Sequence, residues 1–525
     1  MKHETIASRS DLLFSVLIII VLVLVSGGMG VYVLSDPGLN AGTVLLRAAD
    51  AIERYHAEPV RRGAVIESGR QGMFDRLDRY SGYVDVSEYN WMQEELSGAY
   101  GGIGVTIVPH DGGLMLMSVR ETGPAGKAGL LTGDVLIAAD SVPFADLTPN
   151  QASSLLRGEA GTDVLVQVYR PVSQDTIEVT LVRERIPLQH VAWAGFSPGG
   201  AIYIRVLDFD AEASDQILEA LDSLMNVPDG NPVGIILDLR GNPGGLFSEA
   251  YRTANLFLDQ DAFIVGTDGR SRWNEETHFA VHGDMTDGLP MAVIVDNGSA
   301  SAAEIVAGAL QQADRAILVG DTTFGKGLVQ GFIRLPEGDG LRLTVSRYYF
   351  DNAVYLNRFD STLHDTGSGL APDYYYYYPE QDLFLRRLES SLLLQEFAYG
   401  HLDEILALSD DPAAEIELLT RFREYAGAHD FPFESAVTEQ ARKLRDIVRR
   451  ENGRPETQQQ ADRIVGAAVE YDRRLLLSYA DYLVMRLRRI AYEREYGLAR
   501  TYREVIVRER GDIHMAEELL RQRRS

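Results

Sequence analysis

The chain alternates short apolar runs with segments whose apolar residues recur every three or four positions. Apolar runs typical of buried strands occur at residues 201–206, 234–239, 291–296 and 316–319. A helical spacing of apolar residues follows three of these runs, at residues 211–225, 246–258 and 302–312. Strands that alternate with helices predict a parallel or mixed sheet, whose functional residues gather at the carboxyl ends of the strands.

Residues 12–34 form a continuous apolar stretch without a charge, which is long enough to cross a bilayer as a helix. Lys2 and Arg9 precede this stretch, although Glu4 and Asp11 weaken the charge asymmetry. The pattern predicts an uncleaved anchor, with residues 1–11 in the cytoplasm of a bacterium and the catalytic part on the periplasmic or extracytoplasmic side of the cytoplasmic membrane. A cleaved signal peptide is the alternative, although its apolar core would be unusually long.

Composition narrows the classes of function. The formal charge is -27, from 50 Lys plus Arg against 77 Asp plus Glu, which argues against a nucleic-acid partner and favours solubility. The chain has no cysteine, so thiol catalysis, disulfides and thiolate zinc sites are excluded. We predict no metal site and no cofactor.

The stretch around residues 291–330 carries the candidate chemistry. A buried strand ends at Asp296, the turn 297–301 breaks it, and a helix follows, so Ser301 would lie where the first N–H groups of the helix are unpaired. Such N–H groups can stabilise an oxyanion beside a serine hydroxyl. After the next strand, a loop offers Lys326 between two glycines. A serine in this position is more often a helix cap than a nucleophile, so the turn alone is weak support.

The two stretches together, residues 297–305 (NGSASAAEI) and 323–330 (TFGKGLVQ), resemble the active-site signature of the C-terminal processing proteases, also called tail-specific proteases. The resemblance implies that Ser301 is the nucleophile, Lys326 its general base and Gln330 a helper. No sequence-adjacent histidine supports a histidine-based triad, because His278 and His282 lie in a polar segment and are expected to be loop residues.

Residues 238–245 (DLRGNPGG) also resemble a turn of this family. The resemblance implies an oxyanion hole in which the N–H of Ala302 is joined by the N–H of Gly244 or Gly245. Asp238 and Arg240 are expected to hold the turn by buried ion pairing.

Residues 101–183 contain short alternating strands with glycine-rich turns and resemble a PDZ domain. In such domains an extended peptide adds to a strand edge and backbone N–H groups capture its terminal carboxylate. The resemblance places the carboxylate loop at Gly102, Ile103 and Gly104.

These observations predict a multidomain α/β protein with an N-terminal transmembrane helix. The predicted segments are residues 1–11 (cytoplasmic), 12–34 (anchor), 41–100 (helical), 101–183 (PDZ domain), 188–379 (a mixed α/β, ClpP/crotonase-like serine peptidase core) and 380–525 (a helical C-terminal region). The arginine-rich helical end favours contacts with partner helices, including those of a homo-oligomer.

The leading hypothesis is a membrane-anchored serine endopeptidase that recognises apolar protein C-termini through its PDZ domain. Two alternatives stay open at this point: a catalytically inactive PDZ scaffold that binds peptides, and a crotonase-type acyl-thioester enzyme. The match to the family loosens at a polar insert over residues 351–367, which leaves the local shape of the substrate groove open.

Overall fold

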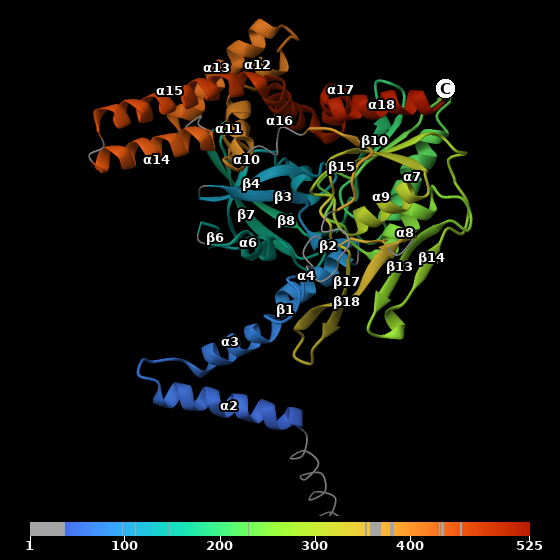
Figure 1. Cartoon of the computed structure of the whole chain (residues 1–525), viewed down its shortest axis with the longest axis vertical. Helices are drawn as coiled ribbons and strands as arrows, with labels where there is room; N and C mark the ends of the chain where they lie inside the picture. Colours follow the sequence, from blue (N-terminus) through green and yellow to red (C-terminus); the bar gives the residue numbers. More distant parts are fainter. Residues whose placement is uncertain are drawn as a thin grey trace, which may run out of the picture. The chain divides into compact units, whose positions relative to one another are not determined.

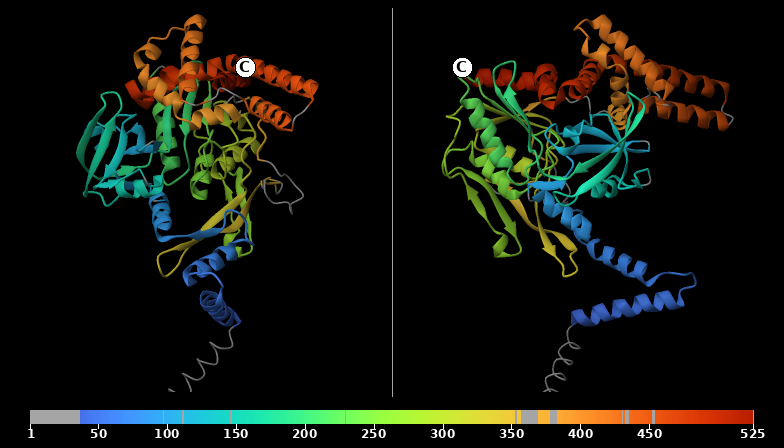
Figure 2. Two further views of the ribbon diagram at one scale, coloured as in Figure 1. Left: turned by 90° about the vertical axis from the view of Figure 1, so that its left-hand side faces the viewer. Right: turned by 180° about the vertical axis from the view of Figure 1, so that it is seen from behind.

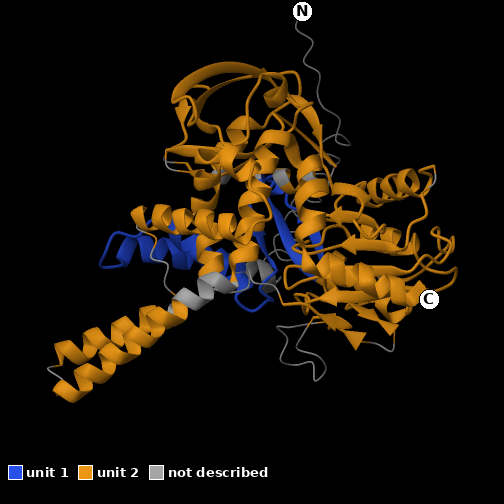
Figure 3. Ribbon diagram, turned by 90° about the horizontal axis from the view of Figure 1, so that it is seen from above, with its two compact units in different colours: residues 1–89, 330–344 blue, residues 90–329, 345–525 orange. Residues whose placement is uncertain are grey.

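The computed structural model describes residues 37–96, 98–110, 112–145, 147–228, 230–351, 354–356, 369–377, 383–429, 431, 435–451 and 454–524. The predicted anchor at residues 12–34 and most of the insert at 351–367 lie outside this part of the chain. Among the described residues, no helix is both long enough and apolar enough to span a bilayer. The chain separates into two units, residues 1–89 with 330–344 and residues 90–329 with 345–525 (Figure 3).

The smaller unit combines N-terminal helices with strand segments from much later in the chain. Its elements are α2 (Pro37–Tyr55), α3 (Arg62–Phe74), β1 (Gly82–Val84), the start of α4 (Val86–Leu96), and parts of β17 (Leu328–Arg334) and β18 (Gly340–Phe350). β1 pairs antiparallel with β18, with Gly82 opposite Arg342. The side chain of Arg342 donates to the carbonyl oxygen of Tyr80, which fixes the end of the helical segment to this hairpin.

The larger unit begins with the segment predicted as a PDZ domain. Its strands and helices are β2 (Ala99–Gly102), β3 (Val105–His110), β4 (Gly113–Val119), α5 (Pro124–Lys127), β5 (Val135–Ala139), β6 (Val142–Pro143), α6 (Pro149–Leu156), β7 (Asp163–Arg170), β8 (Asp175–Val182) and β9 (Glu184–Pro187). The antiparallel sheet has the order β3-β4-β5-β7-β8. Along β7, Val164, Val166 and Val168 point into the core and their neighbours lie outside, which is the alternation of a strand buried on one face.

A second sheet forms the core of the larger unit. It has the order β10 (Val191–Phe196), β11 (Ile202–Val206), β12 (Ile235–Asp238), β15 (Met291–Val295), β16 (Ala316–Gly320) and β20 (Tyr374–Tyr375). β10 is antiparallel to β11, and the other strands are parallel. Every residue of β12, β15 and β16 is buried, because layers cover both faces of the sheet, and this explains the continuous apolar runs in the sequence.

Helices from different parts of the chain cover the two faces (Figure 1). α7 (Ala213–Met225), α8 (Phe247–Asn255) and α9 (Ala302–Gln312) pack on one face. The π-helix η4 (Tyr502–Ile506), α17 (Val507–Glu509) and α18 (Gly511–Arg524) pack on the other (Figure 2). The end of the predicted helical C-terminal region therefore belongs to the core sheet. The reason is a break in α16 (Ala480–Thr501) at Gly497, where φ is +76°, after which Leu498 already packs on the sheet.

The remaining helices confirm the predicted helical C-terminal region. They are α10 (Leu383–Ser390), α11 (Leu393–Gly400), α12 (Leu402–Leu406), α13 (Pro412–Ala428), α14 (Ala436–Arg450) and α15 (Pro455–Ser478). Leu385, Phe397 and Phe422 of α10, α11 and α13 share a core with Leu483 of α16. A further sheet consists of β13 (Phe263–Gly269), β14 (Thr277–Phe279) and β19 (Val354–Tyr355) with β1, β17 and β18, and the 3-10 helix η1 (Arg272–Asn274) precedes β14.

Candidate active site

Ser301 occupies a strained turn at the carboxyl end of β15. Its backbone has φ +54° and ψ -114°, a conformation that residues with a side chain rarely adopt. A hydrogen bond to the neighbouring turn holds it in place, because the hydroxyl of the fully buried Ser299 donates to the carbonyl oxygen of Leu239 (2.8 Å). Strain of this kind concentrates at functional sites and persists only where the surrounding structure enforces it.

Glu304, in the first turn of α9, joins the serine turn to the lysine loop. Its fully buried carboxyl accepts at Oε2 from the N–H groups of Ser301 (2.9 Å) and Lys326 (2.8 Å). At Oε1 it accepts from the N–H of Gly325 (2.7 Å) and the hydroxyl of Thr323 (2.5 Å). Burial raises the pKa of Glu304, although these bonds oppose the shift. Sequence reasoning assigned Glu304 no role; the available signal was an acidic residue three positions after a capping serine.

Tyr348 of β18 is a second partner that Ser301 and Lys326 share. Its hydroxyl donates to the carbonyl oxygen of Lys326 (2.7 Å) and lies 3.3 Å from that of Ser301. Burial raises the pKa of Tyr348 well above its ordinary value, so the hydroxyl keeps its proton as a donor. The structure thus brings Ser301 and Lys326 together at one edge of the core sheet.

The glycines beside the lysine let the loop pack closely. Gly325 has φ +86°, and a Cβ added at Gly327 would lie 1.6 Å from the carbonyl oxygen of Leu356. A side chain at either position would displace Lys326 from its place beside Glu304.

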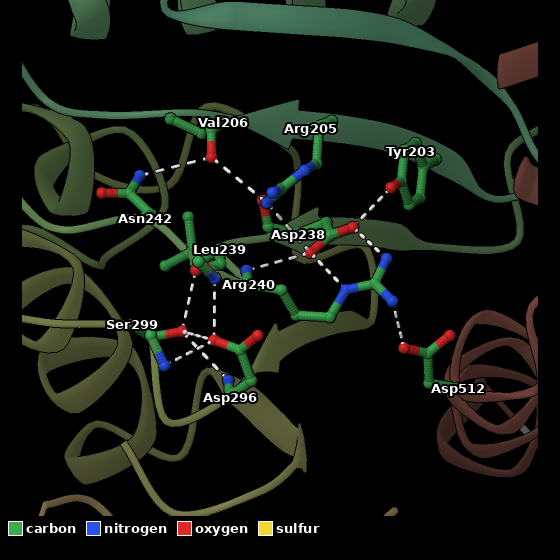
Figure 4. Close-up of polar contacts among 12 residues, drawn as sticks. Tyr203, Arg205, Val206, Asp238, Leu239, Arg240, Asn242, Asp296, Ser299 and Asp512 are labelled. Atoms are coloured by element: carbon green, nitrogen blue, oxygen red, sulfur yellow. Dashed lines mark hydrogen bonds and ion pairs between the residues drawn. The ribbon is translucent and has the colours of Figure 1, made fainter. Parts of the chain in front are cut away.

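The turn after β12 is held by buried charges, as predicted (Figure 4). The guanidinium of Arg240 forms two hydrogen bonds to the carboxylate of Asp238, which also accepts from the hydroxyl of Tyr203. Arg205 approaches the same carboxylate at 3.3 Å. Burial opposes ionisation of Asp238, yet the charges of Arg240 and Arg205 prevail and hold its pKa well below its ordinary range. Sequence reasoning missed a further partner of Arg240, Asp512 in α18.

This turn brings Gly244 against Ser301. A Cβ added at Gly244, where φ is +108°, would lie 2.8 Å from the Cβ of Ser301 and 3.0 Å from the nitrogen of Ala302. The carbonyl oxygen of Asn242 accepts from the N–H of Ala300 (2.9 Å), and the side-chain oxygen of Asn242 accepts from the N–H of Gly244 (2.9 Å). The N–H of Ala302 lies in the first turn of α9, where N–H groups have no intrahelical acceptor. Gly245, with φ +148°, lies against the backbone of Phe209.

Other predicted residues lie elsewhere. Gln330 belongs to the smaller unit, where its side-chain amide donates to the carbonyl oxygen of Tyr80 (2.9 Å). His278, expected in a loop, lies in the short strand β14 and stacks on Tyr251, with ring centroids 4.0 Å apart. Among the described residues, no group of three His, Cys, Asp or Glu side chains could hold a metal ion.

The predicted carboxylate loop forms a separate site. Gly102, Ile103 and Gly104 line a small cavity, together with Tyr100, Val105, Ile107, Ser153, Leu156 and Arg157. The guanidinium of Arg157 lies 4.5 Å from the centre of the Tyr100 ring. Gly104 has φ +78°, and its carbonyl oxygen accepts from the N–H of Arg120, so the loop is fixed by backbone contacts.

Two parts of the chain match known protein families, and several relatives match more than half of the chain. Residues 200–375 match peptidase family S41, and residues 101–181 match the PDZ domain. A carboxy-terminal-processing protease of Bartonella bacilliformis is 32% identical over 338 residues, which cover 64% of this chain and 75% of the relative. The carboxy-terminal processing protease CtpA of Bacillus subtilis is 30% identical over 60% of this chain and 66% of the relative. A photosystem II D1 C-terminal processing protease of known structure is 25% identical, covers 63% of this chain and 92% of that chain, and has a TM-score of 0.37.

Proposed function

Because this chain belongs to the family of carboxy-terminal-processing proteases, we propose that Ser301 is its nucleophile and Lys326 its general base. The observation that carries the proposal is that Ser301 and Lys326 share two buried partners, Glu304 and Tyr348. These partners bind backbone groups of both residues, so they fix the two main chains side by side. Reacting groups held in this way need no further ordering when the substrate arrives.

The proposed reaction is acyl transfer. The neutral amine of Lys326 takes the proton of the Ser301 hydroxyl as its oxygen attacks the substrate carbonyl. The N–H of Ala302, with a backbone N–H of Gly244 or Gly245, holds the oxyanion. The protonated lysine then gives its proton to the leaving amine, and water hydrolyses the acyl-enzyme. Because the N–H of Gly244 donates to Asn242, Ala302 is the first donor that we assign to the oxyanion. Gln330 would assist as a helper, as the family resemblance implies.

Substrate selection is assigned to the PDZ domain. Gly102, Ile103 and Gly104 line one small cavity, which supports capture of a terminal carboxylate by their backbone, and the apolar Leu156 suits an apolar last residue. We expect C-terminal amidation of a good protein substrate to slow its cleavage, while a short neutral peptide is cleaved as before. An unchanged rate for the amidated protein would show that carboxylate capture is not the mode of selection.

The location of the protease is proposed from the sequence. The apolar stretch at residues 12–34 would anchor the chain, with the peptidase on the periplasmic or extracytoplasmic side of the cytoplasmic membrane. A C-terminal fusion to a reporter that is active only in the cytoplasm should be dark. A bright fusion would refute this topology.

The helical C-terminal region would also support a homo-oligomer. Val437, Leu444 and Ile447 of α14 have exposed fractions of 56%, 45% and 50%, and their helical spacing places them on one face. Light scattering should then give a mass above that of one chain, which Leu444→Glu reduces. A monomeric mass for the unaltered protein contradicts this proposal.

The test of the nucleophile is hydrolysis of casein by the wild type, Ser301→Ala and Ser299→Ala enzymes. Ser301→Ala should abolish hydrolysis. Ser299→Ala should keep it, at a lower stability, because the Ser299 hydroxyl is buried and donates to Leu239. Hydrolysis by a folded Ser301→Ala enzyme would refute the assignment.

A further inference from the structure

Two buried carboxylates on α18 bond to opposite edges of the core sheet. Asp512, at the start of the helix, pairs with Arg240 at the carboxyl edge, directly after β12. Glu517, one to two turns later, accepts from the N–H of Gly199 (2.7 Å), which precedes β11 at the amino edge. Both side chains are almost fully inaccessible to solvent. The helix therefore offers one carboxylate at the catalytic edge and a comparable one away from it.

Contacts run from Asp512 to the nucleophile through the turn after β12. Arg240 is held on one side by Asp512 and on the other by Asp238, whose carboxylate also accepts from the N–H of Arg240 (3.1 Å) (Figure 4). The same turn continues to Asn242, which binds Ala300, and to Gly244, which abuts Ser301. Residues 272 positions apart in the sequence thus meet beside the active site.

We propose that Asp512 is a positioning residue for the catalytic turn. By holding the far side of the Arg240 guanidinium, it fixes the turn that places Gly244 against Ser301. The inference rests on the proposed role of Ser301 as nucleophile. It gives the C-terminal helix a part in the reaction through the contact of Asp512 with Arg240.

The charges explain why this one carboxylate matters. Without Asp512, the carboxylate of Asp238 would face the guanidinium groups of both Arg205 and Arg240 alone. Arg510 also contacts Asp512 and would lose its ion pair with that carboxylate. Removing one member of a buried ion network leaves uncompensated charge, which the structure relieves by moving backbone or admitting water. The backbone that carries Arg240 continues into the turn that contains Gly244.

The experiment compares Asp512→Asn with Glu517→Gln in the full-length protein. For Asp512→Asn we expect kcat for a peptide to fall about tenfold with KM within twofold, because small displacements of catalytic groups cost rate more than binding. Labelling of Ser301 by a fluorophosphonate should slow by the same factor. Glu517→Gln should lower Tm by a similar amount but leave kcat within twofold. Asp512→Glu keeps the charge on a longer side chain, so its kcat should be intermediate, about threefold below wild type.

Equal losses of kcat in Asp512→Asn and Glu517→Gln would overturn the inference, because docking of the helix would then matter and not the contact with Arg240. An unchanged kcat in Asp512→Asn would also overturn it. If Asp512→Asn does not fold, Asp512→Glu decides, and a wild-type kcat in that variant contradicts the inference. Hydrolysis of the peptide by a folded Ser301→Ala enzyme would instead refute the proposed nucleophile, so the two failures are distinguishable.

Discussion

Two loops leave the same edge of the core sheet, and they are held in opposite ways. The turn after β12 is fixed by buried charges, with Arg240 between Asp238 and Asp512. The loop after β16 is fixed by uncharged donors, namely backbone N–H groups and one hydroxyl, which converge on the carboxyl of Glu304. The comparison shows that one loop is fixed mainly by ion pairs between side chains and the other mainly by backbone N–H groups that donate to a single carboxyl group.

The two carboxyl groups also respond to pH in opposite directions. The pKa of Asp238 is lowered, so its contribution to stability is present above the ordinary pKa of an aspartate and is lost as the pH falls through the lowered value. The pKa of Glu304 is raised, so its contribution is complete below the ordinary pKa of a glutamate and is lost as the pH rises through the raised value. Acid therefore weakens the turn, whereas the lysine loop becomes less stable as the pH rises.

Among the contacts that hold the two loops, the largest effect is expected where the turn touches Ser301. Gly244→Ala places a Cβ 2.8 Å from the Cβ of Ser301, so we expect kcat to fall about a hundredfold. Gly241→Ala is the matched control, because Gly241 also has a positive φ (+61°) but no heavy atom within 4 Å of the added Cβ. It should cost about 1–2 kcal/mol of stability and little activity. Equal activity of the two variants in a peptide assay would contradict the placement of Gly244.

The lysine loop should depend on the carboxyl of Glu304. In Glu304→Gln, the amide NH₂ must face N–H donors, so we expect the free energy of unfolding to fall by about 2–3 kcal/mol and kcat by about tenfold. Thr323→Val removes only one of the four donors to Glu304 and should cost about 1 kcal/mol. Urea unfolding and steady-state kinetics measure both effects. A Gln variant as stable as wild type would show that the carboxylate does not hold the loop.

The smallest expected effect concerns Asp210, whose backbone lies beside Gly245 of the turn after β12. Burial, and then repulsion from Asp208, raises the pKa of Asp210 to about 6. Because the pKa of Asp210 is raised, the contribution of its protonated form to the stability of the fold is complete below about pH 4 and is lost as the pH rises through about 6. Asp210→Asn should therefore add roughly 1–2 kcal/mol at pH 7.5, after allowance for partial solvent exposure, and almost nothing at pH 4.

Thermal unfolding of Asp210→Asn and the wild type at pH 7.5 and at pH 4 measures this gain in stability. Asp208→Asn serves as the control, because it removes the repulsion but also the partner of His190. A gain that is equal at both pH values would contradict the assignment of the raised pKa to Asp210.

Strands β11, β12, β15 and β16 of the core sheet and the helix after Ser301 could be predicted from sequence, because their burial leaves apolar runs. Strands β10 and β20 of the same sheet are partly exposed and gave no such signal. The ion pair of Asp238 and Arg240 could be predicted because both residues lie in one short turn. Asp512 could not, because its contact depends on how a distant helix packs, and local patterns carry no such information. The packing of the last helices on the core sheet could not be predicted either, because it depends on the break at Gly497 and on contacts with distant strands.

The central claim is that Lys326 acts as a neutral base, in contrast to the arginine that holds the neighbouring turn by its charge. The bonds that fix the loop to Glu304 and Tyr348 use the backbone of Lys326, so its side chain can be changed while these bonds remain. Arginine keeps the positive charge but cannot give up its proton at neutral pH.

The most direct test is the rate of peptide hydrolysis by purified, folded Lys326→Arg enzyme beside Lys326→Ala. Loss of a general base costs about two to four orders of magnitude in rate, so we expect both variants to be inactive to the same extent. Substantial hydrolysis by the Lys326→Arg enzyme would show that the charge is what matters and that another group is the base.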